Sequence, residues 1–211
     1  MFKYPRKIPL FYKILLPSAI TKMQVEEKKI FLSFDDGPHP EITPWILKEL
    51  DKYQAKATFF CTGKNLSEYS NIARLIILKG HQLGNHTFAH ENAWQTSREL
   101  FIRSIEKTQS LINDINSSAK YIFRPPYGKL SPILALKLSK KGYKIYLWTL
   151  MLGDFNAKIK SNVVLNKTIK KIKSGDIIVL HDNEKSFENL KKILPELLEI
   201  LSRKGYRFEK F

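Results

Sequence analysis

The sequence has few of the features that define several large protein classes. It contains a single cysteine, Cys61, so no disulfide can form within the chain. No apolar run reaches the roughly 20 residues needed to cross a bilayer, and neither standard glycine-rich phosphate loop is present. These absences exclude a disulfide-stabilised scaffold and argue against both a membrane-spanning protein and a nucleotide-binding fold.

Acidic residues are also scarce. The chain has 36 Lys and Arg against 20 Asp and Glu, which gives a net charge of +16. Such a balance favours acidic partners, including nucleic acid, anionic glycans and phospholipid surfaces. The lysines are scattered along the predicted helices, however, and no basic-aromatic nucleic-acid motif is found. We therefore expect a lysine-rich solvated surface and no nucleic-acid partner.

The N-terminal residues 1–28 differ from the rest of the chain. Residues 1–23 are basic and apolar, but Lys13 and Pro17 interrupt them and no small-residue cleavage site is convincing. This segment either packs across the bottom of the domain as a strap or makes a peripheral contact with a membrane surface. We favour the strap, because aromatic residues near a terminus usually pack into a core. Without a clear signal peptide, a cytoplasmic or membrane-associated location is expected.

Residues 29–211 show alternating strand and helix signals. Thr43 is expected to cap the first helix, with Pro44 in its first turn, and Gly80 to follow the second helix. Regular alternation of this kind is typical of a parallel β/α domain, and six or seven strands favour a barrel or near-barrel. The predicted strands cover residues 30–34, 57–62, 82–85, 121–123, 143–150, 176–180 and 206–208. The first predicted helix begins at Thr43, and the others cover 65–79, 97–113, 131–141, 161–173 and 186–203. The helix over 97–113 is expected to have one apolar side, formed by Leu100, Phe101, Ile105, Thr108 and Ile112.

Polar clusters follow four of these strands, and in a β/α barrel the carboxyl ends of all strands open onto one face. The clusters are Asp35-Asp36, His86 to His90, Arg124 to Gly128, and His181-Asp182. Taken alone, Asp-Asp-Gly-Pro is also typical of a turn in which Asp36 caps a following helix. Topology nevertheless predicts that residues distant in sequence meet in one cleft.

His86 and His90 are the strongest candidates for a metal site. At a spacing of four, two imidazoles lie on the same side of a helical turn, which is a recurring way to hold a divalent metal. Asp36 can supply a third, anionic ligand and leave positions open for water and substrate. Zinc is the default ion for these ligands, with Co²⁺, Ni²⁺, Mn²⁺ and Fe²⁺ as alternatives. His39 and His81 lack such support and are interpreted as structural.

Four segments, in this order, resemble the motifs of the polysaccharide deacetylases, carbohydrate esterase family four. They are Ser-Phe-Asp-Asp-Gly-Pro, His-Thr-Phe-Ala-His, Arg-Pro-Pro-Tyr-Gly and Leu-His-Asp. The resemblance extends from about Lys29 to Phe208. It implies a single α/β domain folded as a distorted (β/α)7 barrel. It also implies a metal-dependent hydrolase that removes N-acetyl, or sometimes O-acetyl, groups from an amino sugar, oligosaccharide or polysaccharide.

The resemblance also assigns roles to individual residues. It implies that Asp36, His86 and His90 bind the metal and that Asp35 is the general base. It further implies that Arg124 orients Asp35 and keeps it ionised. His181 would be the general acid, and the backbone N–H of Tyr127 would donate to the oxyanion. The role of Arg124 agrees with electrostatics, because a nearby opposite charge lowers a carboxyl pKa. The alternative interpretation of Arg124 is a structural salt bridge, and both roles can hold together.

The weakest match to the family lies around Asp154. Asp154 would bond His181 and hold its charge and tautomer, while Phe155 and Val179 would line a small pocket for the acyl methyl group. Relatives often carry an acidic residue where this chain has Met151, and Trp where it has Phe155. Asn85, just before His86, also fits the family pattern and suggests a turn or a supporting role.

Two other functions remain open. One is an amide hydrolase that acts on a lipid-linked sugar or a small N-acyl compound. The other is a non-catalytic glycan-binding module that keeps the fold. The presence of Asp35 and all three metal-ligand candidates argues against the module. Short predicted loops after the strands favour an open groove for the substrate.

Overall fold

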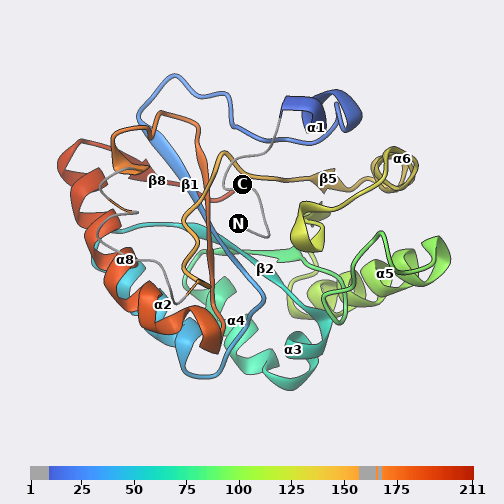
Figure 1. Cartoon of the computed structure of the whole chain (residues 1–211). Helices are drawn as coiled ribbons and strands as arrows, with labels where there is room; N and C mark the ends of the chain where they lie inside the picture. Colours follow the sequence, from blue (N-terminus) through green and yellow to red (C-terminus); the bar gives the residue numbers. More distant parts are fainter. Residues whose placement is uncertain (1–9, 157–164, 166–167) are drawn as a thin grey trace.

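The computed structural model describes residues 10–156, 165 and 168–211 (Figure 1). Its helices are α1 (Leu10–Leu15), α2 (Ile42–Asp51), α3 (Gly63–Glu68), α4 (Ser70–Leu78), α5 (Arg98–Ile115), the 3-10 turn η1 (Pro126–Gly128), α6 (Pro132–Lys140) and α8 (Glu184–Arg203). Its strands are β1 (Lys29–Asp35), β2 (Ala57–Cys61), β3 (Gln82–Asn85), β4 (Ile122–Phe123), β5 (Lys144–Ile145), β6 (Leu150–Met151), β7 (Ile177–His181) and β8 (Arg207–Phe208).

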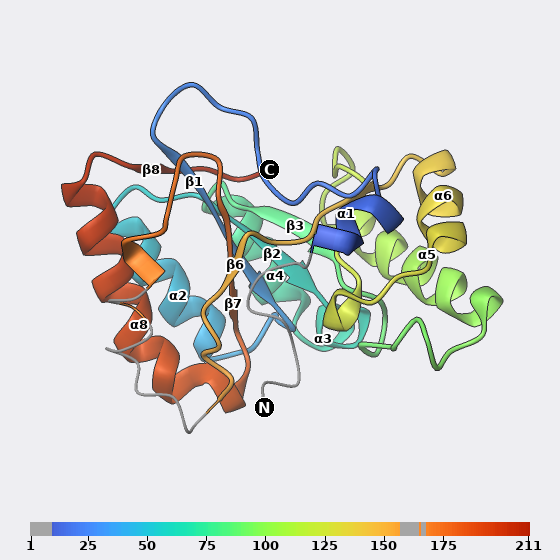
Figure 2. The same cartoon turned by 45° about the horizontal axis from the view of Figure 1, so that its top comes forward.

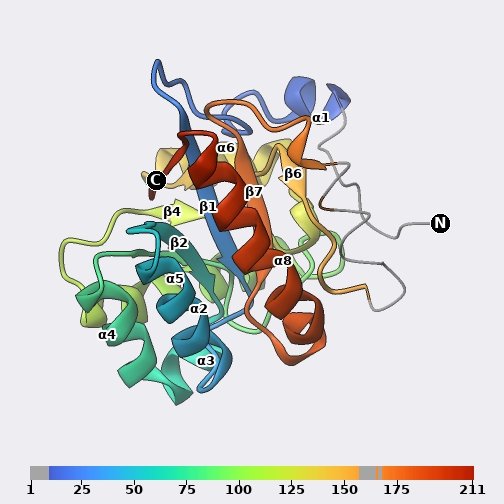
Figure 3. The same ribbon diagram turned by 90° about the vertical axis from the view of Figure 1, so that its left-hand side faces the viewer.

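The strands form one parallel sheet that curves into a half-barrel. Its order is β5-β4-β3-β2-β1-β7-β6, and β8 pairs with β1. In the described chain the path ends at β5 and β6, so the barrel is open there. Figure 1 shows α2 and α8 side by side along one flank, and Figure 3 shows α8 lying across β1 and β7. The predicted α/β barrel-type domain is confirmed in this distorted, half-open form.

Strand β1 is central to the sheet and is buried on both faces from Ile30 onward. Leu32 and Phe34 belong to a core layer between the sheet and the outer helices. Phe31 belongs to the inner layer, together with Val179 of β7. Because side chains alternate along a strand, Ser33 and Asp35 also face the inner side of the half-barrel. Burial on both faces explains why this strand reads as a continuous apolar run.

The described part of the N-terminal segment packs on this body. Leu16 is buried, and Ile20 forms a parallel bridge with Tyr146 just after β5. Further along, the Met23 N–H donates to the Gly175 carbonyl oxygen over 2.8 Å. Figure 2 shows the segment between α1 and β1 arching over the end of the sheet at which β1 begins. These contacts connect the chain just after β5 with the chain just before β7.

The start of α2 differs from the prediction. The helix begins at Ile42, and Thr43 is not its N-cap. The Thr43 hydroxyl instead donates to the Asp182 carboxylate over 2.7 Å and accepts the His39 N–H over 2.8 Å. The His39 ring takes over the capping role, since its Nδ1 accepts from the N–H of Ile42. A tertiary bond to a buried carboxylate has therefore replaced the local cap.

Three further elements were predicted incorrectly in detail. The helix expected over 65–79 is divided into α3 and α4 at Tyr69, whose φ/ψ of −121°/46° is not helical. The strand expected over 143–150 is interrupted, because its middle residues leave the sheet between β5 and β6. On α5, Leu100 is 58% exposed and does not belong to the buried face. Of the helix expected over 161–173, residues 161–164 and 166–167 lie outside the described residues.

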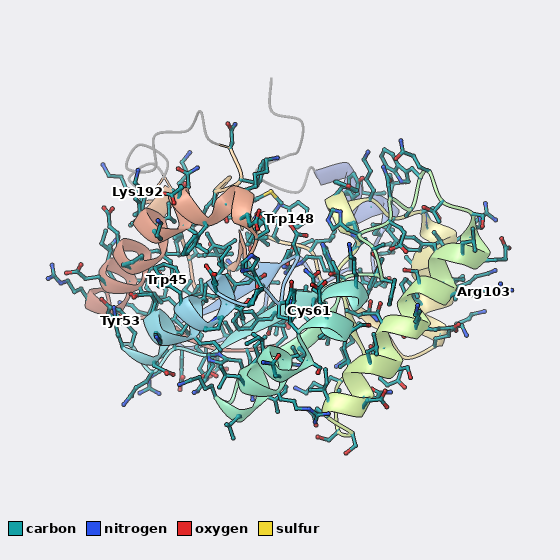
Figure 4. All side chains as sticks on the ribbon, turned by 90° about the horizontal axis from the view of Figure 1, so that it is seen from below. Trp45, Tyr53, Cys61, Arg103, Trp148 and Lys192 are labelled. Atoms are coloured by element: carbon teal, nitrogen blue, oxygen red, sulfur yellow. The ribbon has the colours of Figure 1, made fainter. Side chains whose placement is uncertain are left out.

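The surface carries the excess of basic residues. Figure 4 shows Arg103 on α5 and Lys192 on α8 at the outside of the molecule. In the part of the chain that the structure describes, no helix has the length and apolar character to span a membrane.

Candidate active site

The site begins where β1 ends. Asp35 is the last residue of β1, is 4% exposed and faces inward. Asp36 has a φ of 84°, in the left-handed region that Asp tolerates better than most residues. This turn rotates the Asp36 carboxylate away from the strand direction. The Asp36 carboxylate points at His86 and His90, whereas the Asp35 carboxylate contacts Arg124.

Asp36, His86 and His90 converge on one point. Asp36 Oδ1 lies 3.3 Å from His90 Nε2 and 3.7 Å from His86 Nε2. The ligand atoms of all three residues lie within 4.8 Å of one another. Asp36 Oδ1 is buried and has no hydrogen-bond partner among the described residues, a costly state for a carboxylate oxygen. An unsatisfied anionic oxygen facing two imidazole nitrogens fits a divalent metal ion.

The two histidines do not lie on a helix, which corrects the prediction. Residues 86–90 form an irregular loop after β3, in which Thr87 and His90 have φ of 65° and 58°. Side chains hold this loop: Asn85 Oδ1 accepts the Thr87 N–H, and Ser104 Oγ accepts the Phe88 N–H. The rings still converge, with centroids 5.0 Å apart. Asn85 thus has the turn role that the sequence suggested.

A second set of contacts orients the candidate ligands. His86 Nδ1 lies 2.7 Å from the Arg124 carbonyl oxygen, and His90 Nδ1 lies 3.1 Å from the Tyr127 hydroxyl. Partners on Nδ1 fix the tautomer and direct Nε2 at the ion. Asn183 donates to Asp36 Oδ2 over 2.7 Å and was not identified from the sequence. Because Asn183 stands between His181-Asp182 and a predicted helix, its position in the sequence indicates only a helix N-cap. Asn183 is indeed the N-cap of α8.

Electrostatics favours the protonation states that a metal requires. Burial, which disfavours the charged form, is the main reason why the pKa of His86 falls to about 4. Burial acts to raise the pKa of Asp36, but the charges of His181, His86 and His90 and the Asn183 hydrogen bond outweigh it and lower that pKa. A neutral imidazole and an ionised carboxylate at neutral pH are the forms that bind a metal ion.

Asp35 is paired with a fully buried guanidinium. Arg124 Nη1 donates to Asp35 Oδ1 over 2.6 Å and to Ser33 Oγ over 2.8 Å. Its remaining bonds go to the carbonyl oxygens of Tyr146 and Leu147, each over 3.3 Å. These bonds hold the Asp35 carboxylate in one orientation beside the metal-ligand cluster. The predicted contact between Arg124 and Asp35 is confirmed.

His181 and Asp154 form the second buried pair. Asp154 accepts the His181 backbone N–H with Oδ2 over 2.7 Å and contacts His181 Nδ1 with Oδ1 over 2.9 Å. Burial alone would lower the pKa of His181, but the Asp154 carboxylate outweighs it, with help from Asp36 and Asp35, and raises that pKa to about 9. The imidazole is therefore charged at neutral pH. The predicted contact between Asp154 and His181 is confirmed.

The other predicted residues lie around these pairs. The Phe155 ring meets the His181 ring edge-on at 5.2 Å. Val179 is fully buried on β7, two residues before His181 and on the same face. Tyr127 has a φ of 61° and contacts His90 through ring and hydroxyl. The cluster opens into a cavity of about 410 Å³ lined by Asp36, Thr62, Lys64, Asn65, Ala89, His90 and Asn183.

Three residues set aside as structural lie in structural positions. Cys61 is fully buried, and burial raises the pKa of its thiol well above the usual value. His81 is buried against Phe59 and accepts the Ala57 N–H. His39 caps α2 as described above.

The fold and the site together define the class of protein: an α/β half-barrel with a candidate metal-ligand triad, a carboxylate paired with a buried arginine, and a charged histidine. A polysaccharide deacetylase family model matches residues 22–146, more than half of the chain. A peptidoglycan-N-acetylglucosamine deacetylase of Bacillus cereus is 34% identical over 217 residues, covering 94% of each chain. A chitooligosaccharide deacetylase of Azorhizobium caulinodans is 34% identical over 157 residues, covering 74% of each. The chain belongs to the polysaccharide deacetylase family.

Solved structures agree with this assignment. The structure of the Bc1960 peptidoglycan N-acetylglucosamine deacetylase superposes with a TM-score of 0.88 at 26% identity, covering 97% of this chain and 95% of that one. A protein described as a CE4 family pseudoenzyme from Bacillus anthracis shares the fold, with a TM-score of 0.81 at 24% identity and coverage of 92% of this chain and 68% of that one. The chain spans 66% of another Bacillus cereus deacetylase, which is 31% identical over 185 residues, or 85% of this chain. Activity must therefore be argued from the residues of the site and not from the fold alone.

Proposed function

We propose that this protein hydrolyses the N-acetyl group of an amino sugar within a glycan, with zinc as the bound ion. The observation that carries the proposal is the grouping of three units at one sheet edge. These are the Asp36–His86–His90 triad, the Asp35–Arg124 pair and the His181–Asp154 pair. Ligands, base and acid for amide hydrolysis are thereby all available in one place.

The ion would contribute Lewis acidity, polarising the acyl oxygen and lowering the pKa of water toward about 7. Asp35 takes the proton of the attacking water, and the hydrogen bond from Arg124 holds that carboxylate in its orientation. The water oxygen then bonds to the acyl carbon and the C–N bond breaks. His181 gives its proton to the departing amine, since Asp154 has kept the imidazole charged.

Three residues are proposed to bind the acyl group. The backbone N–H of Tyr127 would stabilise the negative charge that develops on the acyl oxygen. The Phe155 ring, beside His181, and Val179, beneath it, would enclose the methyl group. Phe155 offers an apolar face here without the indole N–H of a tryptophan. The enclosed space would favour acetyl over longer acyl groups.

Zinc is proposed because a two-histidine, one-carboxylate set is a common zinc site, and Co²⁺, Ni²⁺, Mn²⁺ and Fe²⁺ are the competing ions. Peptidoglycan is the first substrate to test, because several relatives are named as peptidoglycan deacetylases. We also infer that residues 29–211 form the catalytic domain and that residues 1–28 act as its strap.

Acetate release tests the proposal. Metal-stripped protein, and the same protein with zinc or cobalt restored, would be incubated with N-acetylglucosamine oligomers and with peptidoglycan. Activity that requires metal and is lost in Asp35→Asn supports the deacetylase. One tightly bound ion without acetate release refutes it and favours an amide hydrolase for lipid-linked sugars or small N-acyl compounds. Glycan binding without hydrolysis would instead identify a non-catalytic module.

A further inference from the structure

An exposed tryptophan lies close to the candidate metal site. Trp94 is 60% exposed, whereas Trp148 is almost fully buried. It belongs to the loop that links His90 to α5. Single exposed hydrophobic residues are common on protein surfaces and need no explanation. The neighbours of Trp94, however, connect it directly to the catalytic cluster.

One lysine joins Trp94 to the site. Lys129 Nζ lies 4.8 Å from the centroid of the Trp94 ring and 5.8 Å from that of Tyr127. The Tyr127 hydroxyl in turn lies 3.1 Å from His90 Nδ1. A ring at Trp94 is thus separated from a candidate metal ligand by one ammonium group and one phenol. Trp94 and Lys129 thus offer an aromatic face and a cation next to each other on this side of the cluster.

The rest of the rim is basic as well. Lys64 lines the cavity of the triad, and Lys185 Nζ lies 5.8 Å from the Phe155 ring on the His181 side. Of the acidic residues in these loops, Glu91 is bonded within its own loop to the Ala89 N–H and the Ser104 hydroxyl. Glu184 lies 3.6 Å from His39 Nε2. Lys64 and Lys185 thus border the cleft together with Lys129, and cations in such positions attract anions.

We propose that Trp94 and Lys129 form a subsite for a sugar that carries a carboxylate and adjoins the acetylated sugar. The apolar face of the sugar ring would stack on the indole, and the carboxylate would pair with Lys129 Nζ. The substrate class is thus an acetylated glycan with alternating acidic sugars, in preference to a neutral one. This inference rests on the proposed deacetylase function.

Matched substrates and variants test the subsite. Acetate release would be measured on two glycans of equal length, one of N-acetylglucosamine alone and one alternating with N-acetylmuramic acid. Lys129→Gln should raise KM up to about fivefold on the acidic glycan only, which is the upper limit for an exposed ion pair. Trp94→Ala should raise KM at least about fivefold on both glycans, because stacking does not depend on charge.

The control is Lys191→Gln on α8, since Lys191 Nζ lies 4.8 Å from the Phe187 ring, a matching pair away from the cleft. It should leave KM unchanged on both glycans. The preference for the acidic glycan should also fall as salt rises, because salt screens exposed charges. Equal KM for both glycans in the unmodified protein, or equal effects of Lys129→Gln on both, would overturn the subsite. Absence of acetate release from either glycan would instead refute the deacetylase function itself.

Discussion

The substitution Asp154→Asn tests whether the negative charge of Asp154, and not only its shape, is needed for the function of His181. The substitution keeps the side-chain volume and one acceptor oxygen but removes the negative charge that raises the pKa of His181 to about 9. Without that charge, the pKa should return to about its ordinary 6.5, because burial lowers it while Asp36 and Asp35 still raise it. The difference corresponds to about 3 kcal/mol of preference for the charged imidazole at 1.36 kcal/mol per pKa unit.

The effect on catalysis depends on pH, because the general acid must be protonated to act. At pH 8 the protonated fraction of His181 should fall from about 90% to about 3%, so kcat should fall about 30-fold. At pH 5.5 both proteins hold the proton, and kcat should differ by less than about twofold. Activity on the preferred glycan would be measured across this range with zinc restored.

An NMR titration of the histidine ring protons in metal-free protein checks the cause directly. The unmodified protein should show one histidine with a pKa near 9, and Asp154→Asn should lack it. Identical titration curves, or a loss of kcat that is the same at every pH, would refute the reasoning. The raised pKa also makes the pair stabilising below pH 6.5, and this contribution is lost as pH rises through about 9.

Three substitutions test the supports of the site and of the fold, two of them through urea unfolding and one through metal binding. Arg124→Met leaves the buried Asp35 carboxylate without its ion-pair partner and should lower the free energy of unfolding by about 3–5 kcal/mol. Gly37→Ala places a methyl group 1.9 Å from an Asp182 carboxylate oxygen, so it should shift the Asp36 turn and weaken zinc binding. Leu16→Ala removes the buried anchor of the N-terminal segment and should cost about 2–5 kcal/mol.

Exposed residues provide the controls for these substitutions. Arg103→Met, on the outer face of α5 (Figure 4), should leave the unfolding midpoint unchanged. Leu15→Ala, at a side chain that is 50% exposed, should have little effect beside Leu16→Ala. If Leu16→Ala were as harmless as Leu15→Ala, the strap would not contribute to stability. Unchanged zinc affinity in Gly37→Ala, or a stable Arg124→Met, would contradict the account of the site.

The sequence by itself determined the alternation of strands and helices and the residues that meet at the sheet edge. The apolar run before Asp35 predicts a buried strand, and the structure places that strand at the centre of the sheet. Strand ends in a parallel β/α domain share one face, so these residues could be expected in one cleft. The specific pairs, His181 with Asp154 and Arg124 with Asp35, were implied by the resemblance to the family, and the structure contains both.

The tertiary structure alone decided how the ligands are held. Spacing predicted a helical turn for His86 and His90, but the loop is set by bonds from Asn85 and Ser104, which lie outside it. Asn183 reaches Asp36 although they are 147 positions apart in sequence. The periodicity of hydrophobic residues and the turn propensities act over a few residues, so they can be predicted from the sequence. Contacts such as these depend on how distant segments pack, and that information is not local.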